Sequence, residues 1–311
     1  MNSTFKIILV SLISFSNITL NAQEGLLKIS QKRNADRTIS FNFEKKDPGT
    51  HTIVLTFTNL ANAFSSSDGI VVKNYGGNLL TLQPINKDQP ITYDSYKYSY
   101  IRGKLNPKFD PDFVYLLPYK NGVKMRTAEV GFVGAKYFGN TTPADWKVYR
   151  FYTPTQDTVT TIRKGLVVDV KDQFEQESAD IAFSNKTNEV TIEHADGTLA
   201  TYKGFKKGSI KVEVGQTLLP GTSLGLNKED SNGRFNVAIA IIYLKSNDFE
   251  ATKNQNLQNS KSMYGFVTPH FATAENSNLI LENKNEYTAL QVPEVVKREL
   301  TKKELKTLGI K

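Results

Sequence analysis

The first third of the chain alternates between apolar and polar residues. Segments 38–43 and 53–57 place an apolar side chain at every second position, and segment 96–100 places a tyrosine at every second position. This period is typical of strands with one buried face. Gly76-Gly77 separates two apolar runs, which predicts a hairpin. No helical periodicity occurs, so we expect residues 24–112 to form a small antiparallel β-sandwich.

The apolar runs become longer from residue 114 to residue 245. Asp196-Gly197 predicts a hairpin turn with positive φ angles. The run RFNVAIAIIYLK, residues 234–245, is apolar almost throughout, as expected of a strand buried on both faces. Its composition also suits a buried helix, but no cap flanks it and Asn-Gly precedes it, so a strand is favoured. The segment NPKFDPDF, residues 106–113, looks like the linker between the two regions.

These patterns predict an all-β protein in four parts. A β-sandwich-like domain (24–112) precedes a second β-sheet domain (114–245) and a β extension (246–292). A short helical tail (293–311) follows, in which Thr301 and Glu304 form a capping box.

Residues 1–22 have the layout of a signal peptide. Lys6 precedes an apolar run that ends near Leu20, and a small-residue cleavage site precedes Gln23. We expect an exported protein, periplasmic or extracellular at a bacterial cell surface, without an integral membrane span after cleavage. An uncleaved anchor is the alternative.

Composition removes several kinds of chemistry. The chain has no cysteine, which excludes disulfides, thiolate zinc sites and a cysteine nucleophile. Its formal net charge is +8, of which Lys6 leaves with the signal peptide. Positive side chains are scattered outside the tail, so no nucleic-acid partner is predicted; anionic envelope polymers are the expected partners of an exported cationic protein.

Five segments of the second region carry an ordered set of prolines, glycines and turns: LLPYKNG (116–122), GLVVDV (165–170), HADGTLATY (194–202), GSIKVEVGQTLLPGTSLG (208–225) and FATAENSNLILENKNEYTA (271–289). Together they resemble the M23 (lysostaphin/LytM-type) peptidase family, all-β zinc enzymes that cut peptidoglycan cross-bridges. The resemblance covers about 170 residues and implies an M23-like fold for the second domain.

The zinc chemistry of that family does not carry over. The family holds zinc through H-x-x-x-D and the second histidine of H-x-H, while the first histidine of H-x-H and the histidine of Y-x-H-L assist the bound water. Counting from the motifs, these positions fall on Trp146, Arg150, Gly204, Phe235 and Val237. None offers a lone pair to zinc, and a fixed cation repels a dication. The resemblance therefore implies a degenerate member with no catalytic residues, metal or cofactor.

The former active-site groove would be bordered by Trp146, Arg150, Tyr202 and Phe235. Its aromatic side chains either fill the space that zinc and its bound water would occupy or offer a surface for stacking. We favour the interpretation that they fill it. The three histidines of the chain, His51, His194 and His270, are expected to be structural.

The sequence therefore predicts an exported, non-catalytic M23 peptidase-like protein that acts as a binding or regulatory module of the cell envelope. Its partner would be peptidoglycan, or a cell-wall hydrolase or other envelope protein, since degenerate family members include activators of cell-wall amidases. Two alternatives stay open. One is an active zinc metalloendopeptidase of peptidoglycan with rearranged ligands, and the other is a β-rich surface or assembly protein.

Overall fold

The computed structural model describes residues 26–66, 68–131, 142–175, 186–248 and 262–307. The predicted signal peptide, 1–22, lies outside these residues. Regular structure in the described part is almost entirely β, with two short helices near the C-terminal end, so the predicted fold class is confirmed. None of these helices is long and apolar enough to cross a bilayer.

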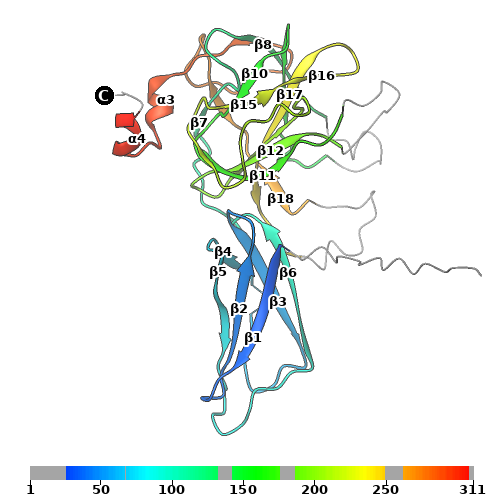
Figure 1. The fold of residues 1–311 in the computed structure, drawn as a ribbon, viewed down its shortest axis with the longest axis vertical. Helices are drawn as coiled ribbons and strands as arrows, with labels where there is room; N and C mark the ends of the chain where they lie inside the picture. Colours follow the sequence, from blue (N-terminus) through cyan, green and yellow to red (C-terminus); the bar gives the residue numbers. More distant parts are fainter. Residues whose placement is uncertain (1–25, 67, 132–141, 176–185, 249–261, 308–311) are drawn as a thin grey trace, which may run out of the picture.

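The N-terminal strands form two facing sheets (Figure 1). The strands are β1 (Leu27–Arg33), β2 (Ile39–Lys45), β3 (His51–Thr58), β4 (Ile70–Val72), β5 (Gly76–Leu82) and β6 (Ser95–Arg102). One antiparallel sheet has the order β1-β2-β5 and the other β4-β3-β6. Phe41 and Leu55 are buried between them, because alternate side chains of each strand point to the same face.

The predicted hairpin at Gly76-Gly77 is wrong. Strand β4 pairs with β3 and strand β5 pairs with β2, so the chain crosses from one sheet to the other between them. The two glycines lie within β5, where Gly77 is opposite Phe43. A local turn pattern cannot show that two consecutive strands belong to different sheets.

The tyrosine row on β6 faces the sandwich interior. Tyr96 packs edge-on against Phe41, with ring centroids 5.1 Å apart. Tyr100 is partly buried against a second apolar cluster of the sandwich, which includes Phe43 and Ile53. Tyr98 is the most exposed of the three, at 38%. This arrangement is that of a half-buried sheet face.

The remaining strands build one large sheet and two small pairs. They are β7 (Val114–Leu116), β8 (Lys124–Glu129), β9 (Tyr149–Thr153), β10 (Thr158–Thr160), β11 (Gly165–Lys171), β12 (Glu189–Glu193), β13 (Leu199–Lys203), β14 (Thr217–Leu218), β15 (Ser223–Leu226), β16 (Lys228–Glu229), β17 (Phe235–Leu244), β18 (Tyr264–Phe266), β19 (His270–Ala272) and β20 (Glu286–Thr288). The large sheet has the order β14-β11-β12-β13-β17-β9-β8-β20, with β16 and β18 paired to β17.

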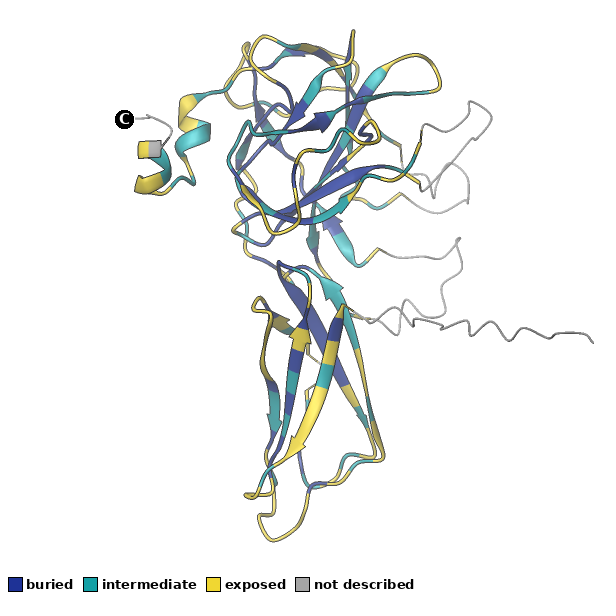
Figure 2. Cartoon of the chain, in the orientation of Figure 1, coloured by how far each residue is buried: buried dark blue, intermediate teal, exposed yellow. Residues whose placement is uncertain are grey.

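Strand β17 lies at the centre of this sheet and is its longest strand, which confirms the predicted strand over the apolar run. Strands β12, β13 and β17 are neighbours in the sheet, and most of their residues are buried (Figure 2). The hairpin between β12 and β13 is also present, but only Gly197 has a positive φ, of 93°.

The segment after β17 completes the sheet. Strand β18 pairs antiparallel with the last residues of β17 and β20 pairs with β8, whereas β19 runs parallel to β7 in a separate two-stranded sheet. The proposed boundary at residue 245 therefore separates strands that share hydrogen bonds, and the domain limits stay predictions.

The predicted linker is packed against the large sheet. Phe113 is 4% exposed, and the ring of Phe109 lies 5.0 Å from that of Tyr243. The backbone N–H of Asn106 donates to the carbonyl of Leu244 at 2.8 Å.

A buried polar contact joins the sandwich to the large sheet. The Glu193 carboxylate accepts hydrogen bonds from the Thr50 backbone N–H (2.7 Å) and hydroxyl (2.5 Å). Nearby, the Lys45 ammonium donates to two backbone carbonyls, and Asp47 pairs with Arg102. Because a buried carboxylate needs such donors, the contact favours one arrangement of the two parts.

The helical tail consists of α3 (Pro293–Lys297) and α4 (Lys302–Thr307). The predicted capping box is confirmed: the Glu304 carboxylate accepts the Thr301 backbone N–H at 2.7 Å, and the Thr301 hydroxyl accepts the Glu304 N–H at 3.3 Å.

A substitution at Gly165 tests the close packing between β11 and β12. A Cβ there would lie 2.4 Å from an Ile192 methyl and 2.7 Å from the Glu193 carbonyl oxygen, so the backbone has to move. We expect Gly165→Ala to lower the free energy of unfolding by about 2 kcal/mol. Gly131→Ala, with nothing within 4 Å of its Cβ, is the control and should be near neutral in the same denaturant titration.

Acid should destabilise the protein through two buried histidines. Burial lowers the pKa of His51 to about 4, with Asp47 opposing the shift, and burial with Arg163 nearby lowers the pKa of His194 to about 3. Both rings stay neutral in the folded protein, whereas in the unfolded chain they take up protons near pH 6.5. The free energy of unfolding is therefore highest above pH 6.5 and falls as the pH drops towards 4. The expected slope is about 1.4 kcal/mol per pH unit and histidine.

Denaturant titrations at pH 7, 6 and 5 measure this slope. His51→Phe should flatten it by one histidine's share, whereas His270→Gln, which leaves both buried rings in place, should not. Equal slopes in all three proteins would contradict the assignment.

Candidate functional site

The register of β9 and β17 separates two faces of the large sheet. Arg150 is opposite Ala238, and Phe151 is opposite Val237. Directly paired residues point to the same side and successive ones to opposite sides. Phe151 and Val237 are fully buried in the core, so Arg150 and Ala238 lie on the other side of the sheet. We call that side the site face; it comprises Arg126, Ala128, Arg150, Tyr152, Lys203, Asn236 and Ala238.

This register corrects the counted positions of H-x-H by one residue. Phe235 and Val237 are on the core side of β17, where two histidines could not meet a group at Arg150. The site face instead carries Asn236 and Ala238. Ala238 has no donor atom, and the Asn236 side-chain N–H donates to the Arg234 carbonyl at 3.0 Å.

Arg150 occupies the centre of the site face. Its strand neighbours are Ala128 and Ala238, whose methyl groups offer no polar atom, and its side chain is half-buried. The Nε atom is buried and has no hydrogen-bond partner among the residues that the structure describes. A guanidinium stays charged at any physiological pH, so this position carries a permanent positive charge.

Gly204 borders the site face at the end of β13. Its φ is +106°, and an added Cβ would lie 3.2 Å from the Asn236 carbonyl oxygen. The backbone here is in the left-handed region, which disfavours any residue with a side chain. A histidine in this position would therefore be strained as well as crowded.

Trp146 precedes β9 and is fixed by packing. Its indole N–H donates to the Val130 carbonyl at 2.7 Å, and its ring centroid lies 4.6 Å from that of Phe266. Tyr202, predicted to border the groove, is instead fully buried in the core. Its hydroxyl accepts the Ile162 N–H at 3.0 Å, and burial raises its pKa.

The residues of the site face do not fit zinc. Zinc needs three protein ligands with lone pairs, at about 2.0–2.3 Å. The site face offers a guanidinium, a methyl group, a glycine and an amide instead. Within the described ranges no three His, Asp or Glu side chains are grouped to hold a metal. His51 is on β3, His194 in the β12–β13 turn and His270 on β19.

One carboxylate on this side of the sheet is already paired with two lysines. Glu189 is opposite Lys203 and is held by Lys171 at 2.5 Å and by Lys203 at 3.2 Å. Burial raises the pKa of this carboxyl, but the two lysines more than offset that and lower it. A carboxylate stabilised in this way is a poor general base near neutral pH.

A pocket of about 430 Å³ opens at the outer end of the site face, between β8, β9 and the turn before β17. Arg126, Tyr152, Arg234 and Glu286 are among its lining residues. The sequence analysis did not single them out, because it relied on prolines, glycines and turns; Glu286 lies within one of the motif segments, 271–289, and the other three lie outside them. The alternation of Lys124, Arg126 and Ala128 along β8 was the available indication that these side chains share a face.

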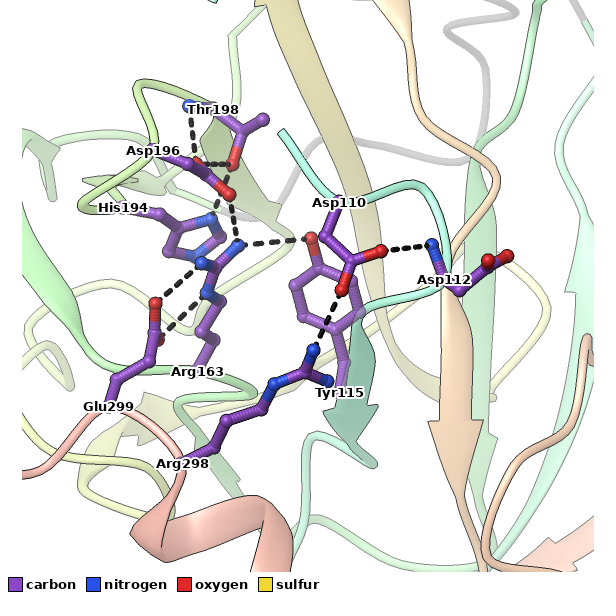
Figure 3. A network of polar contacts seen from close by, with 9 residues as sticks. All are labelled: Asp110, Asp112, Tyr115, Arg163, His194, Asp196, Thr198, Arg298 and Glu299. Carbon is purple, nitrogen blue, oxygen red and sulfur yellow. Dashed lines mark hydrogen bonds and ion pairs between the residues drawn. The ribbon is translucent and has the colours of Figure 1, made fainter. Parts of the chain in front are cut away.

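A separate buried polar cluster holds the helical tail (Figure 3). Arg163, 4% exposed, pairs with Asp196 at 2.7 Å and with both oxygens of Glu299 at 2.5 and 2.8 Å. Its guanidinium lies 3.7 Å from the centre of the Phe113 ring. Arg163 thus neutralises both carboxylates, and Lys164 adds an ion pair to Glu304 at 2.7 Å. The cluster explains why the weakly apolar tail docks on its own chain.

No family model matches the sequence, and no curated protein matches it. Solved structures similar to it include the M23 metalloprotease pseudoalterin from the deep sea, at 15% identity over 58% of this chain and 96% of that chain, with a TM-score of 0.31. The SpoIIQ–SpoIIIAH pore-forming complex is similar at 14% identity over 40% and 83%, with a TM-score of 0.27. A zinc-containing peptidase from Vibrio cholerae is similar at 14% identity over 70% and 75%, with a TM-score of 0.25.

M23 peptidases thus occur among the structures that this chain resembles. Identities and TM-scores at this level carry no information on activity. The M23-like assignment of the second region rests on the motif segments, which fall on β11, on the β12–β13 hairpin and on the turns around β14 and β15.

Removal of the Arg163 side chain should release the tail and destabilise the fold. Arg163→Leu leaves two carboxylates without their shared cation, so we expect a loss of about 3 kcal/mol in the free energy of unfolding. Arg298→Leu removes an exposed pair with Asp110 and should cost under about 1 kcal/mol. Denaturant titration compares the two, and limited proteolysis near residue 300 reports the tail directly.

Proposed function

We propose that this protein is an exported, non-catalytic M23 peptidase-like module that acts in the cell envelope. It binds peptidoglycan, or a cell-wall hydrolase, through the site face of its large sheet. Export follows from the predicted signal peptide, and the M23-like character follows from the motif segments of the second region.

One observation supports the proposal: Arg150 is opposite Ala238, on the face to which the motif count assigns the metal site of the family. A permanent cation there disfavours a dication by direct repulsion, and the neighbouring methyl groups provide no ligand. The left-handed backbone at Gly204 further disfavours the histidine that would assist a bound water. The same positive charge suits an anionic partner, such as a carboxylate of a wall peptide.

Metal analysis and digestion test the lack of catalysis. Purified mature protein should contain far less than one equivalent of zinc after dialysis against zinc-containing buffer. Peptidoglycan cross-bridge peptides should stay intact with it, in the presence or absence of EDTA, while an active M23 peptidase cleaves them in parallel. One tightly held equivalent of zinc together with EDTA-sensitive cleavage would refute the proposal.

Co-sedimentation tests the envelope role. The mature protein should pellet with purified sacculi, or should raise the activity of a purified cell-wall amidase on labelled sacculi. Arg150→Gln should weaken either effect about tenfold, because it removes the central charge of the site face. If folded protein fails in both assays, the envelope-binding role is refuted, and the alternative of a β-rich surface or assembly protein is favoured.

A further inference from the structure

The pocket at the outer end of the site face lies over three neighbouring strands. Arg126 on β8 is opposite Tyr152 on β9 and opposite Glu286 on β20. These three side chains therefore point to the same side of the sheet, with neighbouring Cβ atoms about 5 Å apart. Arg234 reaches the pocket from the turn before β17.

Arg234 is held in place before any ligand arrives. Its Nε and terminal nitrogen pair with the Asp230 carboxylate at 3.1 and 2.8 Å. Its guanidinium carbon lies 4.8 Å from the centre of the Tyr152 ring. An arginine fixed by a carboxylate and an aromatic face loses little freedom when its remaining N–H groups bind an acceptor.

Arg126 and Glu286 are adjacent but are not paired with one another. Within the described part of the chain neither side chain has a hydrogen bond or an ion pair, and both are exposed. The pocket thus presents a cation and an anion side by side, with their hydrogen-bonding groups available. Lys124, also at the rim, makes the cationic side the stronger one.

We propose that this pocket binds a free α-amino acid head group, in which a carboxylate and an ammonium group share one carbon. The carboxylate is bound by Arg126 and Arg234, and the ammonium is bound by Glu286. The stem of the ligand lies along the Tyr152 ring and Pro154. This inference rests on the proposed function, because a diamino dicarboxylic acid that is linked into a wall peptide through only one of its ends carries this head group at the other end.

The size and composition of the pocket agree with such a ligand. A volume of about 430 Å³ is in the lower part of the range for small-molecule sites and accommodates one amino acid side chain with its head group. A simple anion would be served by the arginines alone and would be repelled by Glu286. The presence of both charges therefore selects a zwitterion over a phosphate or an acetate.

An NMR titration with Nε-acetyl-lysine tests the pocket directly. This probe has the free head group and an uncharged stem. We expect saturable shifts of the Arg234 Nε–H and Tyr152 ring signals, with a Kd on the order of 1 mM. Its α-carboxamide and its Nα-acetyl derivative each lack one charge and should bind at least tenfold more weakly. Equal shifts with all three probes, or none with any, would overturn the inference.

Variants assign the two charges. Arg126→Gln should weaken binding of the parent probe about tenfold and leave little difference between the probe and its carboxamide. Glu286→Gln should also weaken binding of the parent probe about tenfold, and it should leave little difference between the probe and its Nα-acetyl derivative. Arg37→Asn removes an exposed cation in the sandwich, at a position with φ 66° that asparagine tolerates, and should bind as the parent protein does. Loss of binding in this control, or none in the pocket variants, would count against the assignment.

Comparison of the probe titration with sedimentation on sacculi distinguishes failure of this inference from failure of the proposed function. Sedimentation with native sacculi but no response to the probe would refute the pocket and retain the envelope role. A probe response without sedimentation or amidase activation would support the pocket and refute the envelope role.

Discussion

The antiparallel register of β9 against β17 decides what this molecule can present to a partner. Because side chains alternate along each strand, burial of Phe151 and Val237 in the core obliges Arg150 and Ala238 to occupy the opposite side. A shift of one residue would bury the guanidinium and expose two large apolar groups. The hydrophobic core therefore fixes the chemistry of the site face, although none of the core residues belongs to that face.

In the proposed M23-like interpretation, the site face takes the position of a metal site but differs from one in its charge. A zinc peptidase concentrates positive charge on an ion that its ligands partly neutralise. Here the charge belongs to Arg150 itself, which exchanges no ligand and activates no water. Towards the outer end of the same face, Arg126 and Arg234 continue the positive charge and Glu286 interrupts it. This arrangement of charges is the basis of the proposed binding role.

Two buried polar clusters hold the parts of the chain around this sheet. Thr50 and Glu193 connect the sandwich to the β12–β13 hairpin, and Arg163 connects the other side of that hairpin to the tail through Asp196 and Glu299. Both clusters have strict geometry, because a buried charge without its partner costs several kcal/mol. The buried charges that attach the sandwich and the tail to this sheet are thus paired away from the site face. They do not use the arginines of the site face.

The sequence by itself determined the strand content, the long central strand and the capping box, since each depends on residue identity or on spacing within one segment. It could not determine that β4 and β5 belong to different sheets, or that the H-x-H count was one residue off, because pairing between distant strands sets both. The pocket between Arg126, Arg234 and Glu286 likewise joins residues up to 160 positions apart. Only the tertiary structure brings such side chains together, because the register of the sheet, and not the order of the chain, decides which of them share a face.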